Sequence, residues 1–316
     1  MEKIFDRLIN AYGVSGNEEC VRNVIKEELK DVNCIIKEDK MGNLIVKIGQ
    51  GKEKIMFCSH MDQIGLIVTY IEDSGLVRVS GIGDFKPEDV INNFVRFKNG
   101  TVGKLGVFKG EMFVDVGMKG REKVLEHVKE GDTACFVGPY LEIENNIVIG
   151  PALDNRTGCY ILIRVIKEIV SRKNYDKELY FVFSSQEELG SRGSRAAAYM
   201  INPDFCIIVD DESTGDTIGG EGSIKLGEGP VIKIMDKTLI ISSAVKGILQ
   251  NAAKKANVNI QYAVTSGNSD GGTIHKERGG IRTGELSIPC RYKHSTSEMV
   301  SMEDVEKAIK LLTEII

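Results

Sequence analysis

Five apolar runs in this chain each lead to a histidine or an acidic residue, and this pattern limits the folds that the chain can adopt. Residues 180–184 are apolar and aromatic without alternation, which is typical of a parallel strand buried on both faces, and they lead to Glu187 and Glu188. Ligands of open α/β sheets bind beyond the carboxyl ends of such strands. The pattern therefore predicts an α/β protein with chemically active side chains at one edge of its sheet.

Four more apolar runs have the same design. They begin near residues 54, 146, 204 and 284. In that order, they lead to His60 with Asp62, to Asp154, to Asp210 with Asp211, and to His294. Two histidines with three or four carboxylates are nitrogen and oxygen ligands that zinc, cobalt and manganese all accept. Because a sheet can bring several strand ends to one metal, the joint pattern predicts a site for two metal ions.

Each of these residues alone also has an ordinary structural explanation. A histidine at a strand end, such as His60 or His294, is more often a hydrogen-bonded imidazole than a ligand. Asp154 could cap the mostly apolar helix expected over residues 156–170. The remaining acidic residues could lie in turns or at a helix N-terminus. The metal site is favoured by the residues taken together.

The pattern changes between residues 64 and 140, where short alternating strands are separated by glycines. This stretch predicts an inserted all-β domain. Residues 1–63 and 141–316 are expected to form the other domain, the candidate catalytic one, with a mixed sheet. Amphipathic helices are expected over residues 2–10, 17–29, 237–256 and 301–315. We expect the small inserted sheet to have exposed edges that a second copy of the chain covers, so that the domain makes a homo-oligomer.

Composition excludes several classes of protein. The chain of 316 residues is 42% hydrophobic, which suits two domains, and its longest apolar runs are too short to span a membrane. The N-terminus has no signal-peptide pattern, and the 7 cysteines are scattered without a C-x-x-C pair, so a reducing cytoplasm is expected. A net charge of -5 without a dense basic patch argues against a nucleic-acid partner.

The chain resembles a known family, the dinuclear metallo-aminopeptidases that include glutamyl, deblocking and tetrahedral aminopeptidases. The resemblance covers essentially the whole chain, in the family's order, through the segments SHMDQIG (59–65), ALDNR (152–156), QEELG (186–190), VD (209–210) and RYKHS (291–295). It implies that two metals are bound by five residues: His60 and Asp210 for one ion, Glu188 and His294 for the other, and Asp154 bridging both.

The resemblance implies roles for two further acidic residues. Glu187 is the implied general base, which takes a proton from a water held between two divalent ions. Asp62 is the implied carboxylate that orients the ring of His60. A cis peptide bond between Asp154 and Asn155 is implied as well. The predicted activity is removal of N-terminal residues from short peptides, with zinc or cobalt as the metal and manganese as an alternative, in dimers that assemble into dodecamers.

The chain departs from the family pattern in a few places. Asp211 and Glu212 stand where the family has an apolar residue and threonine, and they could alter metal affinity or recruit an amine. Residues 295–296 and 266–272 also differ, and His275 follows a double glycine without an assigned role. The alternative function is an endoglucanase-type glycoside hydrolase, because some family members carry that label and glycosidases use paired carboxylates. The absence of tryptophan, a common stacking platform for sugars, argues against it.

Overall fold

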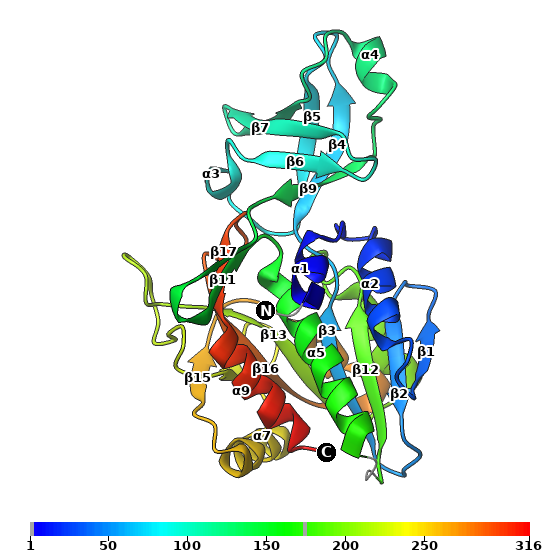
Figure 1. Cartoon of the computed structure of the whole chain (residues 1–316), viewed down its shortest axis with the longest axis vertical. Coiled ribbons are helices and arrows are strands. Elements are labelled where there is room, and N and C mark those ends of the chain that lie inside the picture. Colours follow the sequence, from blue (N-terminus) through cyan, green and yellow to red (C-terminus); the bar gives the residue numbers. More distant parts are fainter. Residues whose placement is uncertain (1–2, 173–175) are drawn as a thin grey trace.

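The computed structural model describes residues 3–172 and 176–316 and has two parts (Figure 1). The larger part is an α/β domain that contains both ends of the described chain, and a small β-barrel stands on it. The barrel is inserted between β3 (Lys54–His60) and β10 (Leu141–Ile143) of the main sheet. The predicted fold, an α/β domain with an inserted β domain, is therefore confirmed.

The α/β domain is built on one mixed sheet of eleven strands. Nine of them lie side by side in the order β1 (Ile35–Glu38), β2 (Leu44–Ile48), β12 (Glu178–Ser184), β3, β13 (Phe205–Ser213), β16 (Arg282–Arg291), β17 (Glu298–Ser301), β11 (Ile147–Gly150) and β10. The other two, β14 (Val231–Met235) and β15 (Gln261–Val264), extend the sheet from β16. The four strands β12, β3, β13 and β16 are mutually parallel, so their carboxyl ends meet at one edge.

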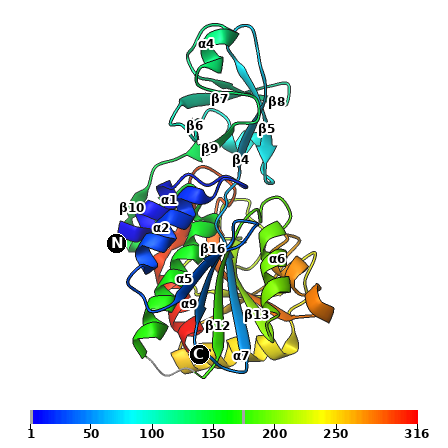
Figure 2. The same cartoon turned by 90° about the vertical axis from the view of Figure 1, so that its right-hand side faces the viewer.

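Helices cover both faces of this sheet (Figure 2). One face carries α1 (Lys3–Asn10), α2 (Glu19–Leu29), α5 (Leu153–Arg172), α7 (Ser243–Ala256) and α9 (Met302–Thr313), and the other carries α6 (Arg192–Ile201), α8 (Gly271–Ile274) and the short η2 (Glu277–Gly279). Alternate residues of one strand enter different cores, since Ile207 packs toward α5 and Ile208 toward α6. Burial on both faces explains why the central strands are apolar without alternation.

The inserted domain is a closed barrel of six antiparallel strands. Around the barrel they are β4 (Gly65–Ile71), β5 (Val77–Ile82), β8 (Glu111–Asp115), β7 (Val102–Phe108), β6 (Phe94–Phe97) and β9 (Thr133–Val137), and the helices α3 (Pro87–Val90) and α4 (Arg121–Leu125) lie in its connections. It has its own apolar core. The expectation of exposed sheet edges is wrong, because β9 pairs with β4 and closes the sheet on itself.

The predicted helix over residues 237–256 is shorter in the structure, because α7 begins at Ser243. The preceding residues form a turn in which Oδ1 of Asp236 accepts hydrogen bonds from the amides of Thr238 and Leu239, at 2.6 and 2.7 Å. The helix predicted over residues 2–10 is α1, although Glu2 lies outside the described residues. Within the described parts of the chain, no helix is both long and apolar enough to cross a membrane.

Candidate metal centre

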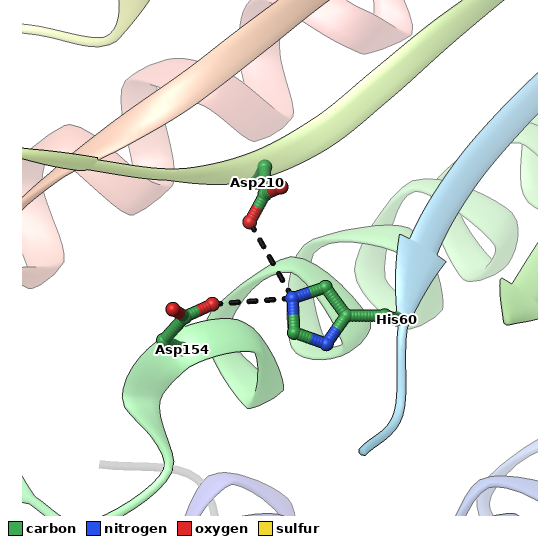
Figure 3. Close-up of side chains that lie close together, drawn as sticks. All are labelled: His60, Asp154 and Asp210. Carbon is green, nitrogen blue, oxygen red and sulfur yellow. Dashed lines mark ion pairs between the residues drawn. The ribbon is translucent and has the colours of Figure 1, made fainter. Parts of the chain in front are cut away.

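His60 is the last residue of β3, and its ring is held between two sets of oxygens. Nδ1 lies 3.0 Å from the main-chain oxygen of Asp62. Nε2 lies 3.2 Å from Oδ1 of Asp154 and 3.6 Å from Oδ1 of Asp210 (Figure 3). Since Nδ1 is engaged by the oxygen of Asp62, Nε2 is directed at the two carboxylates. The three side chains come from β3, the start of α5 and β13, as the strand-end pattern predicts.

A second group of side chains lies on the other side of Asp154. Nε2 of His294 is 3.0 Å from Oδ2 of Asp154 and 3.8 Å from Oε1 of Glu188. The His60 group consists of His60, Asp154 and Asp210, and the His294 group consists of Asp154, Glu188 and His294. Within each group, one ligand atom from every residue lies within 4.8 Å of the others. Asp154 belongs to both groups, so the structure brings together all five residues for which the sequence predicts metal ligation.

The backbone around Asp154 is fixed by a residue that the sequence analysis did not single out. Glu298 accepts hydrogen bonds from the amides of Asp154 at 2.9 Å and His294 at 2.8 Å. The peptide bond between Asp154 and Asn155 is cis, as the resemblance implied. Burial, followed by the nearby carboxylate of Asp154, raises the pKa of Glu298 to about 8. An isolated glutamate after a Ser-Thr-Ser run carries no pattern, so sequence reasoning could not have found it.

Asp62 is fully buried next to His60 and contacts more than its ring. Its carboxylate accepts hydrogen bonds from the amides of Glu187 at 2.9 Å and Glu188 at 3.1 Å, and from Oγ of Ser15 at 2.6 Å. The same carboxylate is 3.6 Å from Nδ1 of His60. Burial raises the pKa of Asp62, but these partners outweigh it and the net direction is downward. Asp62 therefore positions the glutamate pair as well as facing the imidazole.

Glu187 and Glu188 leave the end of β12 in different directions. Glu188 belongs to the His294 group, whereas Oε1 of Glu187 accepts a hydrogen bond of 3.1 Å from Oγ of Ser191. The turn that separates them from the strand has Gln186 in the left-handed region, at φ 56°. Burial and the surrounding carboxylates raise the pKa of Glu187, and burial is the larger cause. Glu188 thus belongs to the His294 group, whereas Glu187 contacts Ser191 and belongs to neither group.

The electrostatics of the centre suit divalent cations. Burial lowers the pKa of both imidazoles, but hydrogen bonds to carboxylates outweigh it, most strongly those to Asp154, and the pKa of His294 rises to about 9. Burial raises the pKa of Glu188 to about 7. Oδ1 of Asp154 is buried, and among the described residues Nε2 of His60 faces it at 3.2 Å. Two imidazoles and three crowded buried carboxylates fit a pair of divalent ions.

The two acidic residues at which the chain departs from the family pattern are buried. β13 continues beyond Asp210 to Ser213, because it pairs with β16 over its full length, so Asp211 and Glu212 are strand residues and not turn residues. Glu212 forms an ion pair with Nζ of Lys233 at 3.0 Å. Asp211 is 1% exposed, so its carboxylate is closed to a substrate amine. His275 is partly buried at the end of α8, and its Nδ1 lies 2.8 Å from the oxygen of Gly271.

The fold and this centre define a metallohydrolase in which one carboxylate is shared between two candidate metal sites. A model of the M42 glutamyl aminopeptidase family matches residues 42–311, and the chain belongs to that family of aminopeptidases. The chain is 45% identical to a candidate aminopeptidase of Acetivibrio thermocellus, over 100% of this chain and 99% of that protein.

The solved structures with similar folds include two TET peptidases and one protein described as an endoglucanase. The TET aminopeptidase of the marine sediment archaeon Thaumarchaeota archaeon SCGC AB-539-E09 is 27% identical, with a TM-score of 0.95 over 99% of this chain and 95% of that one. The Pyrococcus horikoshii TET1 peptidase, which can assemble into a tetrahedron or a large octahedral shell, is 31% identical, with a TM-score of 0.91 and coverage of 99% and 98%. A Thermotoga maritima protein described as an endoglucanase is 26% identical, with a TM-score of 0.84 and coverage of 100% and 97%.

Proposed function

We propose that this aminopeptidase removes N-terminal residues from short peptides with two divalent metal ions. His60, Asp154 and Asp210 would hold one ion, and Asp154, Glu188 and His294 the other. The observation that carries the proposal is the position of Asp154, whose two oxygens face two different histidines at 3.2 and 3.0 Å. When bound, such ions polarise a substrate carbonyl and lower the pKa of a bound water. Zinc or cobalt is the proposed metal, and manganese accepts the same ligands.

The protein's own side chains would move the protons. Glu187 lies beside the ligand groups without belonging to either, so its carboxylate is free to take a proton from the attacking water and return it to the leaving amine. Ser191 donates a hydrogen bond to Oε1 of Glu187 and limits its rotation. Asp62 orients the His60 ring and, through two amides, the turn that carries both glutamates. Asp62 is therefore proposed as a positioning residue.

The activity can be tested on a panel of aminoacyl-nitroanilides with the zinc, cobalt and manganese forms of the protein. Hydrolysis that a chelator abolishes, and that an N-acetyl group on the substrate blocks, supports a metal-dependent aminopeptidase. Carboxymethylcellulose tests the glycosidase alternative in parallel. Release of reducing sugar without hydrolysis of any aminoacyl substrate would refute the proposal.

We propose further that the chain forms homo-oligomers through residues 64–140, as dimers that build dodecamers. The support is the set of large apolar side chains that the barrel leaves exposed, among them Phe94, Val102 and Phe108. The closed barrel removes free strand edges as a reason for pairing, so these side chains are the stronger argument. Light scattering tests the proposal: a mass of 34.8 kDa would refute any oligomer. The seven free cysteines agree with a cytoplasmic location, which we also propose.

A further inference from the structure

A lysine side chain stands inside the candidate metal centre. Nζ of Lys293 lies 3.0 Å from Oδ2 of Asp154, and Nε2 of His294 lies 3.0 Å from the same oxygen. The ammonium therefore already neutralises the carboxylate oxygen that faces the His294 group. A divalent ion bound between Asp154 and His294 needs that oxygen, so the ion and the ammonium compete for it.

In the described part of the chain, no lysine is in direct contact with the carboxylates of the His60 group other than through Oδ2 of Asp154. Among the described residues, no lysine forms an ion pair with Asp210, and the one that pairs with Asp154 does so through Oδ2 rather than Oδ1. Oδ1 of Asp154 faces Nε2 of His60 at 3.2 Å instead. The two groups share Asp154, but they use different oxygens of it. Oδ1 faces His60, whereas Oδ2 faces both His294 and the Lys293 ammonium.

The displaced ammonium would have a second carboxylate nearby. Nζ of Lys293 also donates a hydrogen bond of 3.1 Å to the main-chain oxygen of Asp211. The carboxylate of Asp211 is buried, and in the described part of the chain neither of its oxygens has a hydrogen-bond partner. A buried carboxylate without a partner is costly. The presence of Asp211 is explained if the Lys293 ammonium pairs with it when the metal ion is bound. The side chain of Lys293 is 20% exposed, which leaves it room to move.

We propose that Lys293 competes with the metal ion of the His294 group for Oδ2 of Asp154, and that Asp211 receives the ammonium when this ion binds. The inference rests on the proposed function, because it assumes two ions at these ligands. It makes the centre unequal: the ion of the His60 group binds tightly, and the ion of the His294 group binds weakly and exchanges. Activity would then follow the concentration of available metal through the second ion.

Cobalt(II) titration of the metal-free full-length protein by calorimetry tests this directly. The wild type should bind two ions, the second at least about tenfold more weakly than the first. His294→Ala should remove the weaker event and so identify it. Lys293→Met removes the ammonium at similar length and should strengthen the second event about tenfold or more, while the first changes by less than about threefold.

Lys307→Met is a matched control, because Lys307 is 21% exposed, pairs with Glu303 at 2.8 Å and also donates to a main-chain oxygen. It should change neither event. Asp211→Asn should weaken the second event in the wild type but not in the Lys293→Met protein, because without the ammonium there is nothing for residue 211 to receive. This dependence on residue 293 separates a receiving carboxylate from a merely structural one.

The outcomes distinguish the two levels of the inference. Two cobalt ions with a second event that Lys293→Met leaves unchanged or weakens would overturn the competition alone. An effect of Asp211→Asn that persists without Lys293 would overturn the role of Asp211. Absence of cobalt binding by the wild type would overturn the proposed function and this inference with it. If Lys293→Met does not fold, Lys293→Gln is judged by the same ratio of affinities.

Discussion

The main-chain oxygen of Asp84 lies 2.6 Å from Nδ1 of His294, although the two residues are 210 positions apart. Asp84 belongs to the connection between β5 and α3 of the inserted barrel, while His294 follows β16 of the main sheet. The contact holds the His294 ring so that Nε2 faces Asp154 and Glu188. The barrel supplies none of the five candidate ligands, yet it orients one of them.

Gly83→Ala should disturb this contact. Gly83 has a φ of +85°, and a Cβ there would lie 2.6 Å from Cγ2 of Ile64 and 3.1 Å from Oε2 of Glu188, so the connection must shift. We expect the affinity of the His294 group for metal to fall about 10–100-fold, as is typical when a ligand loses its orienting partner. Metal content by mass spectrometry after dialysis measures this.

Gly100→Ala is the control for Gly83→Ala. Gly100 has a similar φ of +91°, but an added Cβ would meet nothing within 4 Å, so it carries the backbone strain without the contact. Equal metal loss in the two variants would mean that strain, rather than the position of Asp84, is responsible.

Glu187→Gln and Glu188→Gln should have different effects although the residues are adjacent. Glu187 lies outside both ligand groups, so its variant should retain both metals while turnover falls about 10²–10⁴-fold, the usual contribution of general acid–base catalysis. Glu188→Gln should lose the ion of the His294 group. Metal analysis together with turnover separates the two roles, and metal-free Glu187→Gln with loaded Glu188→Gln would reverse the assignment.

Removal of metal should destabilise the protein as well as inactivate it. Ions that bind only the folded state stabilise it by RT ln(1 + [L]/Kd), which is about 2.7 kcal/mol when the free metal is at 100 times Kd. Differential scanning calorimetry with and without chelator should therefore show a lower melting temperature for the metal-free protein. Restoring the metal should restore both activity and melting temperature; an unchanged melting temperature would contradict tight binding at the centre.

Arg156→Met should lower the free energy of unfolding, although no contact of Arg156 with substrate is proposed. Arg156 is fully buried, and its guanidinium donates to the main-chain oxygens of Leu8 at 2.6 Å, Met61 at 2.8 Å and Ala11 at 3.1 Å. Its loss leaves several buried carbonyls without a donor, so we expect a loss of about 3 kcal/mol or more in the free energy of unfolding. Urea denaturation measures it.

Arg195→Met provides the comparison for Arg156→Met. The Arg195 side chain is 67% exposed and pairs with Glu277, so its loss should cost less than about 1 kcal/mol. A similar loss of stability in both variants would show that the buried carbonyls are not the cause.

The sequence predicted the ligand set because its chemistry depends on residue type and on strand ends. His60 ends an apolar run, and parallel strands deliver their carboxyl ends to one edge, so the pattern predicted that His60, Glu188 and Asp210 lie near one another. The division of the ligands between two ions, with Asp154 shared, came from the family resemblance. Residues that act through the main chain left no such signal. Neither Asp84, which uses its carbonyl, nor Glu298, which accepts two amides, could be recognised from its neighbours in sequence.

Closure of the barrel was also beyond the sequence pattern. Alternation identifies strands and their inward faces, but whether a sheet closes depends on the pairing of its first and last strands. Here β4 and β9, which are separated by most of the insertion, pair through Gly65 and Cys135. The late start of α7 shows a similar limit, because the turn at Asp236 is local chemistry inside a stretch with helical periodicity.

The pairing of Gly65 with Cys135 has a consequence for the modularity of this fold. The chain enters and leaves the barrel on neighbouring antiparallel strands, which are about 5 Å apart, so a domain of any size could be grafted there without separating the strands of the main sheet. The contact from Asp84 to His294 restricts that freedom. A replacement domain must place a main-chain oxygen against Nδ1 of His294, as Asp84 does. Exchange of the barrel between proteins would therefore test catalysis as well as assembly.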